Sequence, residues 1–159
     1  MALCLMHMRG EPAMMQQHPH YDDVVAEVRE YLAARVRACV AGGIEPGRLC
    51  VDPGFGFGKL LEHNLQLLRR LRELQSLGLP VTVGLSRKSM VAALMRDARS
   101  PAPASPLAPA SAPAAGERLA ASVALATIAV LHGAAIVRAH DVAATVDAVR
   151  VAGAVISPP

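Results

Sequence analysis

The stretch 51–59, Val-Asp-Pro-Gly-Phe-Gly-Phe-Gly-Lys, joins a short apolar run to a leucine-rich segment. The apolar run 49–51 is typical of a buried strand, and Pro53 ends its pairing because proline has no amide hydrogen to donate. Glycines then alternate with Phe55 and Phe57, so the backbone can turn sharply before a helix resumes at Leu60. The strand therefore ends at Asp52, a carboxylate beneath a glycine loop with aromatic sides, which suits the binding of a small polar ring.

Two common nucleotide-binding motifs do not fit this stretch. The phosphate-binding P-loop needs a glycine separated by four residues from its Gly-Lys pair and a Ser or Thr after the pair, and Pro53 and Leu60 occupy those places. The dinucleotide fingerprint fails because the glycines stand at positions 54, 56 and 58. An ordinary glycine-rich turn between a strand and a helix is the alternative interpretation.

Composition indicates one globular domain with a weak positive charge. The chain has 159 residues, of which 53% are hydrophobic and 18% charged, and its net charge of +3 is too small to indicate a nucleic-acid partner. Cys4, Cys39 and Cys50 lie among apolar neighbours, and we expect buried, reduced thiols in a cytoplasmic protein without a signal peptide. The six scattered histidines predict no zinc site. The uncharged run 119–137 is rich in alanine and predicts a buried helix followed by a strand, not a membrane span.

Four units along the chain each consist of an apolar run, a polar or glycine-rich break and a stretch with helical periodicity. The predicted strands are 3–6, 49–51, 81–85 and 135–137. The predicted helices begin near Asp22, which is expected to cap the first, and near residues 60, 89, 116 and 142. Their apolar stripes are Val25, Val28, Leu32 and Val36, then Leu61, Leu65, Leu68 and Leu71, and finally Val142, Val146 and Val149. Residues 100–115 are almost all Pro, Ala and Ser, which predicts a flexible insertion.

This alternation predicts an α/β fold with a parallel sheet covered by helices on both faces. In such folds the chemistry lies at the carboxyl ends of the strands. Each predicted strand is followed there by polar side chains, whereas the amino ends of the strands carry no comparable group of polar residues. The polar positions are His7 and Arg9, Asp52, residues 86–89, and Arg138 with His140.

Five motifs in the same order resemble the C-terminal part of the dihydropteroate synthase family. They are Leu-Met-His-Met-Arg-Gly-Glu-Pro (5–12), Asp-Pro-Gly-Phe-Gly-Phe-Gly-Lys (52–59), Gly-Leu-Ser-Arg-Lys-Ser-Met (84–90), Gly-Glu-Arg-Leu-Ala (116–120) and Val-Arg-Ala-His-Asp-Val (137–142). The resemblance covers nearly the whole chain except residues 100–115. The pterin-binding domain of methyltetrahydrofolate methyltransferases shares the fold but is not expected to carry the Ser-Arg-Lys-Ser block.

The resemblance implies half of a (β/α)8 TIM barrel, a fold that typically needs about 250 residues. This chain would supply about four βα units, strands five to eight, with helices outside. Nothing in it resembles the family's opening segment, which provides an asparagine that binds magnesium (Mg2+). We therefore expect no metal ligand in this chain. The family joins p-aminobenzoate to 6-hydroxymethyl-7,8-dihydropterin diphosphate, with loss of diphosphate.

For the pterin, the resemblance implies that Asp52 accepts hydrogen bonds from the ring's guanidine-like edge. Lys88 would donate to the pterin carbonyl and ring nitrogen, and Met6 and Phe57 would line the faces of the ring. The alternatives are that Asp52 only caps the glycine loop and that Met6 and Phe57 belong to the core.

For the other substrate groups, Arg87 and Ser89 are expected to bind p-aminobenzoate, Ser89 from a helix start that favours a carboxylate. Arg138 and His140 would hold the diphosphate. Together with Lys88 they are the three expected catalytic residues. A solvated helix start is the alternative for residues 86–89, and a helix cap is the alternative for His140.

Three functions remain open from the sequence. The first is a cytoplasmic dihydropteroate synthase acting on small molecules, as a possible homodimer without nucleic-acid or membrane partners. The second is a catalytically inactive truncated fragment that serves as a binding or interaction module. The third is the pterin-binding domain of a methyltransferase, which the Ser-Arg-Lys-Ser and Arg-x-His blocks disfavour.

Overall fold

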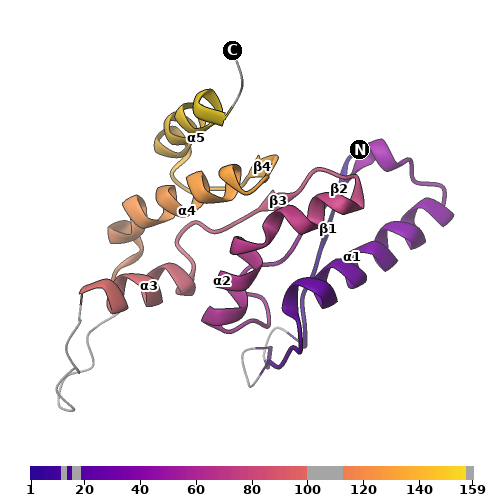
Figure 1. Ribbon diagram of the computed structural model, residues 1–159, viewed down its shortest axis with the longest axis horizontal. Helices are drawn as coiled ribbons and strands as arrows, with labels where there is room; N and C mark the ends of the chain where they lie inside the picture. Colours follow the sequence, from indigo (N-terminus) through magenta and orange to yellow (C-terminus); the bar gives the residue numbers. More distant parts are fainter. Residues whose placement is uncertain (12–13, 16–18, 100–112, 157–159) are drawn as a thin grey trace.

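A computed structural model describes residues 1–11, 14–15, 19–99 and 113–156 of the chain. Most of the predicted insertion, residues 100–112, lies outside the described residues. The fold is α/β, and its helices follow one another in chain order around the strands, with α5 at the end of the molecule far from α1 (Figure 1). The elements are β1 (Leu3–Met6), α1 (Val24–Ala41), η1 (Pro46–Arg48), β2 (Leu49–Asp52), α2 (Leu61–Arg69), η2 (Leu71–Leu77), β3 (Thr82–Val83), α3 (Ser89–Arg99), η3 (Ala115–Arg118), α4 (Leu119–Leu131), β4 (Ile136–Val137) and α5 (Val142–Ile156).

The strands pair in parallel, as predicted. β1 pairs with β2 in a register that runs from Leu3 opposite Leu49 to Met6 opposite Asp52, and β3 pairs with β4. A parallel bridge between Val51 and Val81 places β3 beside β2. The four strands therefore follow one another in chain order, with their carboxyl ends at one edge.

Helices cover one face of these strands in the described part of the chain, and the expectation of cover on both faces is wrong there. Val51 and Val83 are fully buried, and Leu5 packs against the same core. Successive side chains alternate between the two faces of a strand. On the second face, Cys4 of β1 is exposed and Ile136 of β4 is 46% exposed, whereas Cys50 is partly buried and Thr82 is only 6% exposed. This face is therefore open at its two outer strands.

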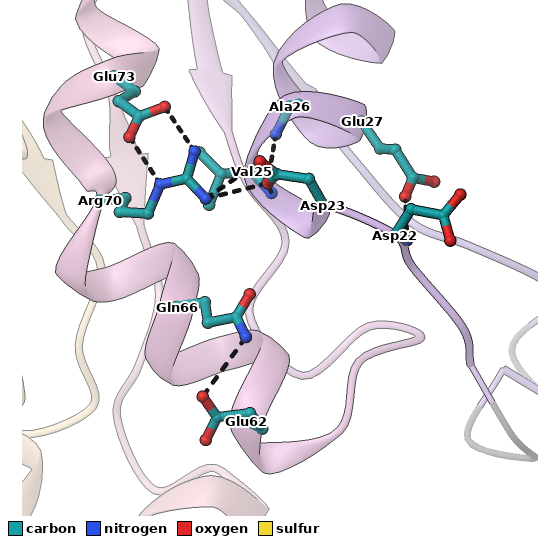
Figure 2. Close-up of polar contacts among 9 residues, drawn as sticks. All are labelled: Asp22, Asp23, Val25, Ala26, Glu27, Glu62, Gln66, Arg70 and Glu73. Carbon is teal, nitrogen blue, oxygen red and sulfur yellow. Dashed lines mark hydrogen bonds and ion pairs between the residues drawn. The ribbon is translucent and has the colours of Figure 1, made fainter.

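The first helix begins one residue later than expected and is joined to the second unit at that point. Asp23, not Asp22, is the cap: its Oδ1 accepts from the amides of Val25 at 2.9 Å and Ala26 at 3.1 Å. Figure 2 shows the Arg70 guanidinium between Asp23 and Glu73, at 3.1 Å from Asp23 Oδ1 and 2.7 Å from Glu73 Oε1. This network ties the start of α1 to the end of α2.

The second predicted helix divides in two at the same arginine. Arg70 has φ −108° and ψ 20°, so α2 ends there and the chain continues as the 3-10 helix η2. Leu71 and Leu74 are nevertheless fully buried, and Gly78, with φ +68°, ends η2 as the expected glycine stop.

Some predicted apolar positions do not reach the core. Val142 is 61% exposed, and Val146 and Val149 line an apolar hollow of about 300 Å3 with residues of α4 and β4. The cysteines are free, but Cys4 is exposed because it lies on the open strand face, so the prediction of a buried thiol is wrong there. None of the helices in the described residues combines the length and the hydropathy of a membrane span.

Candidate active site

A cavity of about 320 Å3 lies at the carboxyl ends of β3 and β4. Four predicted site residues line it, namely Phe57, Lys88, Arg138 and His140. The remaining lining residues are Gly84, Ser86 and Ala139. The strand ends therefore bring together residues that lie up to 83 positions apart in the sequence, from 57 to 140.

Asp52 ends β2 at the edge of this cavity and is only 3% exposed. Its Oδ1 accepts from the Gly54 amide at 2.7 Å, and its Oδ2 lies 3.6 Å from Nη2 of Arg138. Burial raises the pKa of Asp52, and the Gly54 amide and the charges of Lys88 and Arg138 oppose that rise. One carboxylate oxygen thus caps the glycine loop while the other faces cations, so the loop-capping alternative is correct for Oδ1.

The glycine loop lies directly against the end of β1. Gly54 has φ +69°, and a Cβ built there would lie 1.8 Å from the His7 carbonyl oxygen. At Gly58, with φ +64°, a Cβ would lie 2.2 Å from the Arg9 carbonyl oxygen. Only glycine permits both this backbone conformation and this close approach.

Lys88 reaches the cavity through the glycine loop. Its Nζ donates to the Phe55 carbonyl oxygen and lies 4.5 Å from the centre of the Phe57 ring. Burial lowers the pKa of Lys88, and the negative charge of Asp52 opposes that shift. The amine is therefore held by the glycine loop, through the Phe55 carbonyl oxygen and the Phe57 ring.

Arg138 and His140 face the cavity from β4 and the turn after it. The Arg138 side chain lies across Gly84, where a Cβ would approach Nη2 to 3.0 Å. His140 is held by Ser86, whose Oγ lies 3.1 Å from Nδ1 and accepts from the His140 amide at 3.3 Å. No spacing in the sequence links Ser86 to His140, and only the pairing of β3 with β4 brings them together.

Besides Asp52, which contacts the cavity residue Arg138 without lining the cavity, three predicted site residues are absent from the lining. Arg87, with φ 59°, pairs with Asp141 through distances of 3.1 Å and 2.6 Å. Ser89 is exposed at the start of α3 and borders a second hollow of about 230 Å3, together with Lys59, Asn64 and Arg96 among others. Met6 is half-buried and stands opposite Asp52 in the β1–β2 register.

The donor set at the cavity fits a polar ring and an anion, and it does not fit a magnesium ion. The carboxylate of Asp52 faces the cationic side chains of Arg138 and Lys88. Among the described residues, no group of three or more His, Cys, Asp or Glu side chains is placed to hold a metal. Hard cations prefer several oxygen ligands, which this cavity lacks.

Comparisons with known proteins agree with this chemistry. The family described as "Pterin binding enzyme" matches residues 1–140. The dihydropteroate synthase of Escherichia coli K12 is 46% identical over 155 residues, which are 98% of this chain and 49% of that protein. The dihydropteroate synthase of Mycobacterium leprae is 44% identical over 154 residues, 96% of this chain and 51% of that protein.

Solved structures give the same result. The Yersinia pestis dihydropteroate synthase with a sulfonamide drug complex superposes with a TM-score of 0.85 at 42% identity, over 97% of this chain and 50% of that one. The Xanthomonas albilineans enzyme in complex with 7,8-dihydropteroate superposes with a TM-score of 0.81 at 44% identity, over 99% and 52%. This chain spans about half the length of the dihydropteroate synthases that it matches, and it belongs to the pterin-binding enzyme family.

Proposed function

We propose that this chain supplies the pterin and diphosphate half of a dihydropteroate synthase active site. The observation that carries the proposal is the cavity in which Lys88, Arg138 and His140 meet beside Asp52. The reaction would join p-aminobenzoate to 6-hydroxymethyl-7,8-dihydropterin diphosphate in folate synthesis. Breaking the bond between the methylene carbon and the diphosphate oxygen leaves positive charge on the methylene, which the amine of p-aminobenzoate attacks before it loses a proton.

Each cavity residue has a task that follows from its position. Asp52 Oδ2 accepts from the amino and ring N–H groups of the pterin, and Lys88 donates to its carbonyl oxygen while the Phe57 ring supports the bound ring. Arg138 and His140 donate to the departing diphosphate. Catalysis is therefore positioning and charge stabilisation, without a covalent enzyme intermediate.

The p-aminobenzoate site is proposed at the start of α3. Ser89 borders the second hollow at the N-terminus of α3, and the dipole of a helix favours a carboxylate at that end. Arg87 is held by Asp141, so its guanidinium must leave that pair before it can contact p-aminobenzoate as predicted. Magnesium stays a prediction about residues outside this chain, and the steps above do not depend on it.

We also propose that the four strands form half of a (β/α)8 TIM barrel whose interior is the open strand face. The relatives are about twice as long as this chain, and barrel strands bury their second face against other strands. Exposed apolar side chains on α4 and α5, including Ile128 at 39% and Val155 at 77%, are compatible with a homodimer. A cytoplasmic location stays a prediction.

The test compares the chain alone with the chain mixed with a separately expressed polypeptide that supplies the remaining half of the E. coli relative. Formation of dihydropteroate is measured with both substrates and magnesium, and Lys88→Ala is the control. We expect no activity from the chain alone, and activity in the mixture that Lys88→Ala abolishes. A mixture that assembles but makes no dihydropteroate would favour the alternative, an inactive interaction fragment. Activity of the chain alone above the Lys88→Ala level would overturn the need for a complement.

A further inference from the structure

Lys59 is a buried amine directly after the glycine loop, and the mechanism above gives it no task. It is 3% exposed, it borders the second hollow beside Ser89, and it is absent from the residues that line the Lys88 cavity. A lysine is almost never fully buried unless its charge is paired or its protons have partners. Its burial therefore requires a reason.

Three partners surround the Lys59 amine. Nζ donates to the carbonyl oxygens of Gly54 and Phe57, each at 3.0 Å, and lies 2.9 Å from Nδ1 of His7. Burial lowers the pKa of Lys59 to about 7, so only part of the population is charged near neutral pH. In the ammonium form the amine has three protons, and each has one partner when His7 is neutral. Burial lowers the pKa of His7 to about 3, which keeps its ring neutral near pH 7.

These contacts hold both ends of one turn. The Phe57 amide also donates to the Gly54 carbonyl oxygen at 3.1 Å, so residues 54 and 57 close a turn that carries Phe55. Asn64 Oδ1 accepts from the Gly56 amide at 2.8 Å, and the Tyr21 hydroxyl donates to the Gly58 carbonyl oxygen at 2.9 Å. Among these side chains, only Lys59 contacts both ends of the turn and also His7, the residue directly after β1.

The same turn supplies both contacts that hold the Lys88 amine. Phe55 provides the carbonyl oxygen to which Nζ of Lys88 donates, and Phe57 provides the ring beneath it. A shift of the turn would therefore move Lys88 within the cavity, although Lys59 itself does not contact a ligand there.

We propose that Lys59 is a positioning residue: by joining Gly54, Phe57 and His7, it holds the glycine loop where Phe55 and Phe57 fix the Lys88 amine. The inference rests on the proposed function only for the identity of the ligand that Lys88 binds. The mechanical part, from Lys59 through the loop to Lys88, can be measured without any ligand.

Lys59→Met is the informative substitution, because methionine keeps an unbranched stem and removes all three donors. Lys59 and Lys88 are the only lysines in the chain, so Lys88 is the sole lysine side chain of the variant. Its acetylation rate at pH 8 is followed by mass spectrometry in the wild type and the variant. Hydrogen exchange of the Gly56 and Phe57 amides is measured in parallel, with the α1 amides as reference.

We expect Lys88 in Lys59→Met to be acetylated up to about tenfold faster, because the loop no longer holds it. The Gly56 and Phe57 amides should exchange faster, while the α1 amides keep their wild-type rates. Asp23→Ala is the matched control: it destabilises the chain at the α1 cap and should leave the relative exchange of the loop and the rate at Lys88 unchanged.

Two results would overturn the proposal. One is an unchanged loop and an unchanged Lys88 rate in Lys59→Met. The other is a uniform acceleration of the loop and α1, which would give Lys59 a purely structural role. Titration with 6-hydroxymethylpterin in the complemented protein tests the proposed function separately: absence of binding to the wild type would count against that function, and the loop measurements would still decide the role of Lys59.

Discussion

Replacement of Gly54 by alanine is expected to part the glycine loop from β1. The new Cβ would lie 1.8 Å from the His7 carbonyl oxygen, whereas real Cβ atoms essentially never approach within 3.0 Å, so the backbones must separate by about 1.2 Å. The clash is with backbone and not with a flexible side chain. The His7 backbone is also held in place, because its amide donates to the Asp52 carbonyl oxygen at 3.0 Å. Overpacking of this kind costs about 1–3 kcal/mol. The left-handed backbone, with φ +69°, adds about 1 kcal/mol.

Gly78→Ala is a control matched in backbone conformation. Gly78 has φ +68°, and a Cβ there would meet nothing within 4 Å, so only the conformational cost of about 1 kcal/mol remains. Urea unfolding followed by far-UV circular dichroism should show a total loss of about 2–4 kcal/mol for Gly54→Ala and about 1 kcal/mol for Gly78→Ala. Equal losses in the two variants would refute the close approach of loop and strand.

Three further results are expected. The pKa of His7 is about 3 in the folded chain and about 6.5 when the chain is unfolded. The free energy of unfolding should therefore fall as the pH is lowered from 6.5 to 3, by at most about 5 kcal/mol. Urea titrations at several pH values should show this dependence, and His7→Asn should flatten it. Arg87→Gly should be less destabilising than Arg87→Ala by about 1 kcal/mol, because both lose the Asp141 pair but only glycine relieves φ 59°; the reverse order in thermal unfolding would contradict the strain. Asp23→Ala should cost about 1 kcal/mol and Asp22→Ala almost nothing, and a larger loss for Asp22→Ala would contradict the observed cap.

Local patterns in the sequence predict much of this fold. Apolar runs and glycine stops locate all four strands and most helix ends, because strand alternation and helical periodicity are local properties. The predicted Val25–Val28–Leu32 stripe is buried, whereas Val142 is not, because burial on α5 depends on what packs beside it. The break at Arg70 was not predictable from periodicity, since it follows from ion pairs with Asp23 and Glu73 that only the tertiary structure forms.

For the candidate site, the sequence predicts which residues lie together but not the contacts between distant units. Polar residues after parallel strands meet at one edge, and Phe57, Lys88, Arg138 and His140 do line one cavity. The Arg87–Asp141 pair was not predictable, because it joins residues that are 54 positions apart and belong to different strand–helix units. Lys59 and its contact with His7 were missed for the same reason, since nothing local distinguishes a buried lysine from a solvated one.

The thiol of Cys4 on the open strand face can be used to follow whether that face is covered. Cys4 and Cys50 stand opposite each other in the β1–β2 register, and Cys4 is exposed on that face. Burial raises the pKa of the Cys4 thiol to about 11, so an alkylating reagent will label it faster at alkaline pH, where more thiolate is present. A polypeptide that covers this face is expected to shield Cys4 from the reagent, and the labelling rate then measures how completely the face is covered.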